Sequence, residues 1–211
     1  MVMIITGASH TGKTLLAQRM LEKYRIPYLS IDHLKMGLIR SGNTSLTPED
    51  DDEMTAYIWP IVQEMIKTAI ENKQSLIVEG CYIPFGWRND FAEEYLREIS
   101  FICLAMTDRY IDEHFEEIKA HASDIESRMD DSGCSIGWIK AENRNYREGF
   151  EAAGEPVNLI DASYGQALDE ALKAPCARIK AAEAEGDVGE GLPEPDKSPQ
   201  TGKCGPAGIP L

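Results

Sequence analysis

Positive charge and cysteine pairs are scarce in this 211-residue sequence. Its 21 lysines and arginines face 36 aspartates and glutamates, which gives a formal net charge of −15. A surface that binds the phosphates of nucleic acid or an anionic membrane needs clustered lysine and arginine, so neither partner is expected. The five cysteines contain no C-x-x-C pair, so we expect no disulfide framework and no zinc site. Such cysteine usage fits the reducing cytoplasm.

Long hydrophobic runs are also missing. No stretch approaches the roughly 18 apolar residues that a membrane span requires. The apolar residues 1–5 follow no basic segment and lead directly into a glycine loop, which argues against a signal peptide. Beyond residue 182 glycine, proline and charged residues dominate, and no aromatic residue follows Tyr164. Because this composition cannot bury enough apolar area to offset its ordering entropy, we expect residues 183–211 to be a disordered tail, with a linker or localisation role as the alternative.

Residues 1–182 alternate short apolar runs with segments of helical periodicity, which predicts one domain. The apolar runs at 2–6, 26–31, 75–78, 99–105 and 156–160 are typical of buried parallel strands. Helical patterns follow all of these runs except the third; one of them opens at Thr47-Pro48, and the last covers residues 164–182. This alternation predicts an α/β three-layer sandwich with a five-stranded parallel sheet and helices on both faces. We expect the last strand beside the first, and a helical lid at about residues 122–147.

The segment GASHTGKT, residues 7–14, matches the pattern G-x-x-x-x-G-K-[ST] between a predicted strand and a predicted helix. Its glycines allow backbone N–H groups to curl around an anionic oxygen, and the helix adds its positive N-terminal dipole. Lys13 would reach the β- and γ-phosphates of ATP, and Thr14 would bind Mg²⁺. The predicted nucleotide-binding residues are Gly7, Ala8, Ser9, His10, Thr11, Gly12, Lys13 and Thr14. The alternative is a glycine turn with an exposed lysine.

Two carboxylates end the second and third predicted strands, at the edge of the sheet where ligands gather. Asp32 is a candidate for holding Mg²⁺ or for accepting the proton of an attacking hydroxyl, and the alternative is a helix cap. Glu79 is a candidate for orienting metal-bound water, and the alternative is a buried structural pair. Gly80 beside it would let a substrate approach the backbone. The predicted metal ligands are therefore Thr14, Asp32 and Glu79.

Several other side chains are candidates for contacts with the substrate or the nucleotide. A guanidinium suits an anionic group, so Arg40, at the end of a helix, and Arg88 are predicted to contact the acceptor. A solvated arginine at a helix end is the alternative for Arg40. Asp161 and Ser163 follow the fifth strand and are predicted to contact the adenine.

Three arginines fall within the predicted lid. Arg128 lies in a polar segment and is assigned to the acceptor. Arg144 and Arg147 are three positions apart and share a helix face, so they are predicted to clamp the transferring phosphoryl group. The alternative is ordinary ion pairing with acids of the same helix, namely Glu142, Glu148 or Glu151.

With these motifs the sequence resembles the P-loop small-molecule kinases of the adenylate kinase and shikimate kinase type, including zeta-toxin-like and 2-phosphoglycerate-kinase-like members. The resemblance covers roughly residues 1–180, and VEGCYIP at residues 78–84 looks most like the last of these branches. It implies ATP as donor, essential Mg²⁺, and a hydroxyl or phosphate acceptor between Arg40 and the lid. The sequence departs from shikimate kinases because their glycine triplet is absent at residues 79–81.

The sequence therefore predicts an ATP-dependent kinase of a small anionic metabolite, working as a monomer or homodimer. A zeta-toxin-like kinase of nucleotide sugars is one alternative. A non-catalytic ATP-binding regulatory module is the other.

Overall fold

A computed structural model of the chain describes residues 1–120 and 134–173. The outer part of the predicted lid, with Arg128, and the predicted tail lie outside the described residues. The strands are β1 (Val2–Gly7), β2 (Tyr28–Ser30), β3 (Leu76–Glu79), β4 (Ile99–Met106) and β5 (Val157–Ile160). The helices are α1 (Lys13–Tyr24), α2 (Ile31–Arg40), α3 (Asp51–Glu71), the 3₁₀ turn η1 (Trp87–Asp90), α4 (Glu93–Leu96), α5 (Asp108–Ala120), α6 (Ile136–Ala152) and α7 (Tyr164–Ala171).

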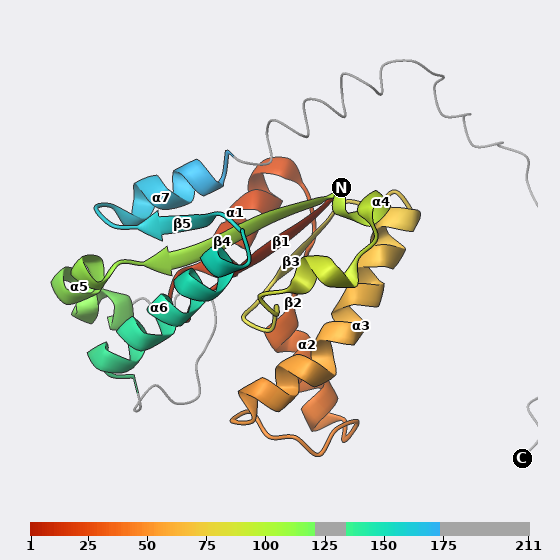
Figure 1. Cartoon of the computed structure of the whole chain (residues 1–211), viewed down its shortest axis with the longest axis horizontal. Coiled ribbons are helices and arrows are strands. Elements are labelled where there is room, and N and C mark those ends of the chain that lie inside the picture. Colours follow the sequence, from red (N-terminus) through yellow and green to blue (C-terminus); the bar gives the residue numbers. More distant parts are fainter. Residues whose placement is uncertain (121–133, 174–211) are drawn as a thin grey trace, which may run out of the picture. The chain divides into compact units, whose positions relative to one another are not determined.

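The five strands form one parallel sheet in the order β2-β3-β1-β4-β5, which confirms the predicted fold class (Figure 1). The central strand β1 is buried along its whole length because helices cover both faces of the sheet. The expectation that the last strand lies beside the first was wrong. A strand has two edges, and β3 and β4 occupy both edges of β1, so β5 pairs with β4 instead.

Two layers of helices enclose the sheet (Figure 1). On one face α3 and α6 pack over β1, and Phe150 of α6 shares a buried cluster with Val2 and Ile4. On the other face α1 contacts β1, β2 and β3, and the Tyr24 hydroxyl of α1 donates to the Leu172 carbonyl after α7 at 2.7 Å. No helix in the described part of the chain combines the length and apolarity needed to cross a bilayer.

Several element boundaries differ from the predicted ones. The second strand stops at Ser30, which holds the N-cap position of α2, so Asp32 lies inside the first turn and does not cap it. The helix predicted from Pro48 begins at Asp51, because Thr47 donates its N–H and hydroxyl to Asp50 and forms a turn first. The last helix ends at Ala171, and residues 174–182 of the predicted helix lie outside the described residues.

Gly149, inside α6, shows why a residue of low helix propensity is found in this helix. A Cβ there would lie 2.5 Å from Cζ of Phe85, whose ring packs edge-on against Phe150 with centroids 4.9 Å apart. We therefore expect Gly149→Ala to lower the free energy of unfolding by about 1–3 kcal/mol through overpacking. Denaturant unfolding measures it. Gly137→Ala, on the same helix with nothing within 4 Å, is the control and should leave stability unchanged or slightly raise it. Equal stability of both variants would contradict this packing.

Candidate active site

The loop of residues 7–14 joins β1 to α1 at the carboxyl edge of the sheet. Gly7 has φ 141°, and a Cβ on it would lie 2.1 Å from the Leu104 carbonyl oxygen of β4, so glycine alone fits this position. Gly12 takes the N-cap position of α1 with φ 83°. Within the loop the Thr11 hydroxyl donates to the Ala8 carbonyl at 2.7 Å. The result is a tightly turned backbone ahead of a helix N-terminus, as anion binding requires.

Lys13 lies inside this loop and is only 7% exposed. Its ammonium donates to the Ala8 carbonyl at 2.8 Å. Burial opposes the charged form, but Cys81 and the carboxylates of Glu142, Glu79 and Asp32 outweigh it and raise the pKa of Lys13 above its usual value. Burial also raises the pKa of the Cys81 thiol, so near neutral pH the carboxylates are the anions around Lys13. The alternative of an exposed lysine on a glycine turn was wrong.

The predicted metal ligands lie around Lys13. The Thr14 hydroxyl donates to the Glu79 carboxylate at 3.4 Å, and Glu79 is fully buried at the end of β3. Asp32, in the first turn of α2, is close enough for its charge to act on Lys13. In the described ranges no three His, Cys, Asp or Glu side chains form a complete metal site. Phosphate oxygens and water would therefore have to complete the coordination of Mg²⁺, as is usual for that ion.

The predicted arginine contacts are not brought to this loop in the described structure. Arg144 points to Asp108 of α5, with Nε 3.1 Å from both carboxylate oxygens, so its partner lies on another helix and not on its own. Nη2 of Arg147 lies 3.8 Å from Glu148, one of the acids considered. Arg40 is exposed at the end of α2. Contacts of these arginines with a substrate stay a prediction.

Arg88, Asp161 and Ser163 also have protein partners. Arg88 forms a two-point ion pair with Glu155, with Nη2 3.0 Å from Oε2. Asp161 accepts from the Thr107 hydroxyl at 2.7 Å and pairs with Arg109. The Ser163 hydroxyl accepts from the backbone N–H of Gln166 at 3.3 Å and thereby caps α7. Their predicted contacts with acceptor and adenine stay predictions as well.

Sequence reasoning missed one face of α6 that lies against the loop. We call the residues Cys134, Trp138, Glu142 and Tyr146 the α6 stripe; the last three are spaced by four on one side of the helix, and Cys134 lies just before the helix begins. Sγ of Cys134 lies 3.9 Å from Nε2 of His10, and the Trp138 ring meets the His10 ring edge-on with centroids 6.5 Å apart. The Ser9 N–H donates to Glu142 at 3.1 Å. The spacing can be read in the sequence, but these residues mix apolar, polar and charged side chains and so form no recognisable pattern.

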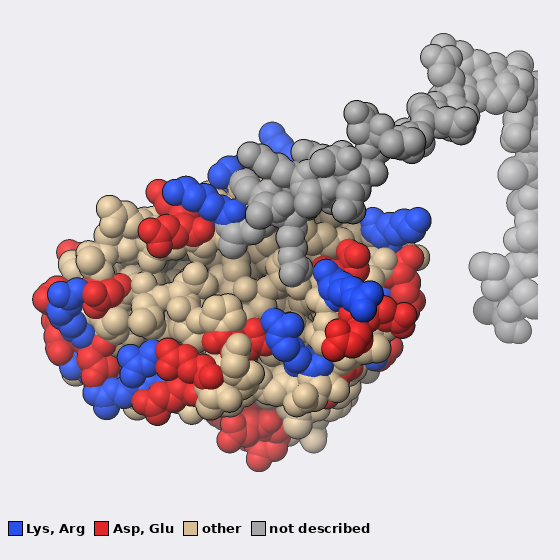
Figure 2. Space-filling model, turned by 45° about the horizontal axis from the view of Figure 1, so that its top comes forward, with Lys and Arg blue, Asp and Glu red and all other residues tan. Residues whose placement is uncertain are grey.

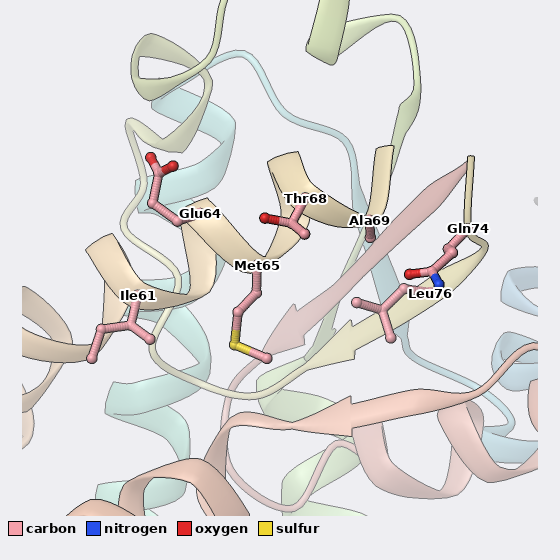
Figure 3. A pocket seen from close by; sticks show the side chains of 7 residues that line it. All are labelled: Ile61, Glu64, Met65, Thr68, Ala69, Gln74 and Leu76. Atoms are coloured by element: carbon pink, nitrogen blue, oxygen red, sulfur yellow. The ribbon is translucent and has the colours of Figure 1, made fainter. Parts of the chain in front are cut away.

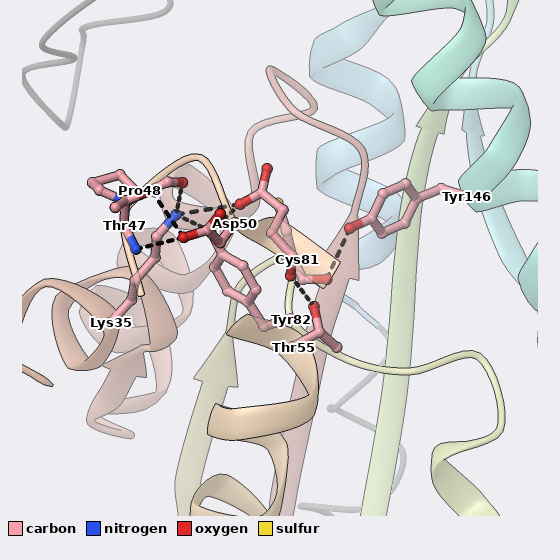
Figure 4. Close-up of polar contacts among 9 residues, drawn as sticks. Lys35, Thr47, Pro48, Asp50, Thr55, Cys81, Tyr82 and Tyr146 are labelled. Carbon is pink, nitrogen blue, oxygen red and sulfur yellow. Dashed lines mark hydrogen bonds and ion pairs between the residues drawn. The ribbon is translucent and has the colours of Figure 1, made fainter. Parts of the chain in front are cut away.

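The α6 stripe also contacts the loop after β3. The Tyr146 hydroxyl donates to the Cys81 carbonyl at 2.8 Å (Figure 4). Burial raises the pKa of Tyr146, so this hydroxyl stays protonated and keeps its donor. One helix face therefore contacts both the phosphate loop and the segment that follows Glu79 and Gly80.

A buried lysine, also missed, fixes the helix that carries Asp32. Lys35, one turn further along α2, donates to the Pro48 carbonyl at 2.8 Å and to the Tyr82 hydroxyl at 2.5 Å (Figure 4). It also lies 3.3 Å from Asp51, which accepts from Tyr82 at 3.0 Å. These contacts tie α2 to the start of α3 and to the loop after β3, and so hold Asp32 in place.

A pocket on the outer surface of α3 is separate from this site (Figure 3). Its lining residues are Ile61, Glu64, Met65, Thr68, Ala69, Gln74 and Leu76. Leu76 begins β3 whereas Glu79 ends it, so the pocket lies toward the amino ends of the strands and the loop lies at their carboxyl ends.

On the face shown in Figure 2, lysines and arginines lie among aspartates and glutamates around an uncharged area.

Solved structures resemble this fold. A putative kinase from Chloroflexus aurantiacus J-10-fl matches with a TM-score of 0.54 and 15% identity, over 85% of this chain and 96% of that one. A gluconokinase from Sinorhizobium meliloti 1021 matches with a TM-score of 0.50 and 15% identity, over 88% of this chain and 97% of that one. A deoxyadenosine kinase from M. mycoides matches with a TM-score of 0.50 and 12% identity, over 86% of this chain and 100% of that one. The chain has the fold of the P-loop small-molecule kinases.

No protein-family model matches the sequence, and no curated protein sequence matches it. At such low identities the P-loop kinase fold is established by shape, and the residues of the site have to be argued from their own geometry. That geometry places Lys13 and Thr14 at the carboxyl edge of the central strand, where ligands of open α/β sheets bind.

Proposed function

We propose that this protein is an ATP-dependent phosphotransferase that transfers the γ-phosphate to a hydroxyl or phosphate group of a small molecule. The observation that carries the proposal is the buried, charged Lys13 within a glycine loop, beside Thr14, Glu79 and Asp32. Lys13 and the loop N–H groups would hold the phosphates, Thr14 and Glu79 would hold Mg²⁺, and Asp32 would hold Mg²⁺ or accept a proton. The bound ion would neutralise charge that develops on the transferring group.

Asp32 is the candidate for receiving the proton of the attacking hydroxyl. Lys35 fixes α2 one turn away, so the carboxylate is held on a rigid element, and phosphoryl transfer depends chiefly on such positioning. The fully buried Glu79 is directed at Thr14 and fits the metal side of the site better than the proton transfer.

The described charges favour a neutral, hydroxyl-bearing acceptor over 2-phosphoglycerate. Carboxylates surround Lys13, whereas the described arginines predicted to recognise an anion either pair with protein acids or, like Arg40, end a helix in solvent. An anionic acceptor would meet like charge there. Sugars and nucleosides have suitable hydroxyls, and one of the structural neighbours is described as a deoxyadenosine kinase.

The test is release of ADP from ATP and Mg²⁺ across a panel of sugars, nucleosides, 2-phosphoglycerate and nucleotide sugars, with Lys13→Ala as the blank. One acceptor that stimulates release above the blank supports the proposal and names the substrate. Stimulation by a nucleotide sugar would favour the toxin-like alternative. ATP binding with no stimulated release would favour the regulatory module. If calorimetry detects no ATP binding, the kinase and the regulatory module are both contradicted. We expect the protein to work in the cytoplasm, as a monomer or homodimer.

Replacing Asp32 by asparagine separates chemistry from binding. Asn keeps the size of the side chain and removes its basicity, so we expect kcat to fall by about 10²–10⁴-fold while the Kd for ATP changes little. Stopped assays of ADP formation and calorimetry give the two values. Asp52→Asn, the same change at an exposed acid of α3, is the control and should behave as wild type. An equal loss of kcat and ATP affinity would instead make Asp32 a structural residue.

A further inference from the structure

Glu142 is an anion that already uses the anion-binding loop. Its Oε2 accepts a hydrogen bond of 3.1 Å from the Ser9 N–H, and its charge helps to raise the pKa of Lys13. Both partners are of the kind that bind phosphate: a loop N–H group and a buried ammonium. The carboxylate reaches them from α6, 133 residues away in the sequence from Ser9.

A terminal phosphate and Glu142 would compete for the same partners. The lysine of such a loop reaches the β- and γ-phosphates, so ATP and Glu142 share Lys13. Two anions beside one buried cation repel each other strongly, because the low dielectric of a buried site screens them poorly. ADP lacks the γ-phosphate and meets less of this repulsion.

We infer that Glu142 is a specificity-determining residue that distinguishes ATP from ADP at this loop, and that ATP displaces its side chain together with the first turns of α6. The inference rests on the proposed function, because it requires a nucleotide at the loop.

The other side of α6 is anchored, which limits what can move. Lys140 lies 2.6 Å from Asp112, and Arg144 pairs with Asp108, so two ion pairs fix the helix to α5. Trp138, at 46% exposed, lies in the first turn of the helix beside His10. We therefore expect the displacement in the Glu142 side chain and the first turns, which carry the contacts with the loop.

Calorimetry with Glu142→Gln tests the specificity. Glutamine keeps an oxygen that accepts from Ser9 and loses only the charge. We expect it to lower the Kd for ATP with Mg²⁺ by about tenfold and to change the Kd for ADP by less than about threefold. Glu151→Gln, an exposed glutamate of the same helix, is the control. A thermal melt verifies that each variant is folded.

The outcomes separate this inference from the proposed function. If wild type and Glu142→Gln bind ATP equally, or if the variant gains equally for ATP and ADP, Glu142 only supports the loop and the inference is overturned, while the proposed function stands. If neither wild type nor Glu142→Gln binds ATP or ADP, the inference and the proposed function are both contradicted.

Trp138 fluorescence tests the displacement directly. We expect ATP with Mg²⁺ to change the emission of Trp138 clearly more than ADP does, because only ATP displaces the first turn of α6 and moves the Trp138 ring away from His10. Trp138→Phe supplies the blank for the buried Trp59 and Trp87. Equal signals from both nucleotides, or no signal from ATP at a saturating concentration, would contradict the displacement.

Discussion

Replacing Lys13 by alanine is expected to lower kcat/KM for phosphoryl transfer by at least about 10³-fold. The lysine is 7% exposed, and surrounding carboxylates keep it charged, so its ammonium is a preorganised partner for charge that develops on the phosphate. Its removal also leaves Asp32, Glu79 and Glu142 without their cation. We therefore expect ATP affinity to fall along with turnover. Coupled assays of ADP formation and calorimetry measure the two losses.

Two control variants make that result specific. Lys23→Ala removes an exposed lysine from the last turn of the same helix and should retain wild-type activity. Lys13→Met keeps most of the length of the side chain without its charge and should lose as much activity as alanine. If Lys13→Ala were folded and kept a tenth or more of wild-type kcat/KM, this loop would not be the site of phosphoryl transfer.

The phosphate loop and the fold are predictable because their signals are local. The loop pattern spans eight consecutive residues, and its glycines mark backbone positions that a Cβ cannot occupy, as at Gly7 beside Leu104. Buried parallel strands appear as short apolar runs bounded by helical periodicity. Each of these features depends on neighbours in sequence, so the class of fold and the place of Lys13 and Thr14 follow without coordinates.

The rest of the site depends on contacts between distant parts of the chain. Ion pairing of Arg144 was considered only with acids on its own helix, whereas Asp108 lies 36 residues away. The partner of Ser9, Glu142, is 133 residues away. The fourth strand pairs with one edge of β1, and β5 therefore pairs with β4. No local signal in the sequence specifies which strand pairs with that edge. Charged partners and strand neighbours of this kind need the assembled fold.

Replacing Arg88 by alanine is expected to lower the free energy of unfolding by about 2–3 kcal/mol. The two partners of this ion pair differ sharply in exposure, since the Arg88 side chain is 46% exposed and that of Glu155 is 1% exposed. Removing the arginine leaves a buried carboxylate without its cation, which costs about 3–5 kcal/mol in fully buried pairs. Solvent around Arg88 reduces the figure here. Loss of the guanidinium stacked on Trp87, 4.7 Å from the ring centroid, adds to the effect.

A double variant distinguishes this structural role from the predicted acceptor contact. In Arg88→Ala/Glu155→Gln the buried charge is absent, so we expect most of the lost stability in denaturant unfolding to return. If Arg88 instead contacts the acceptor, Arg88→Ala should be nearly as stable as wild type, and its KM for the acceptor should rise. The double variant would then keep the raised KM, because neutralising Glu155 supplies no group that binds the acceptor. Stability and KM together therefore assign Arg88 to the fold or to the substrate.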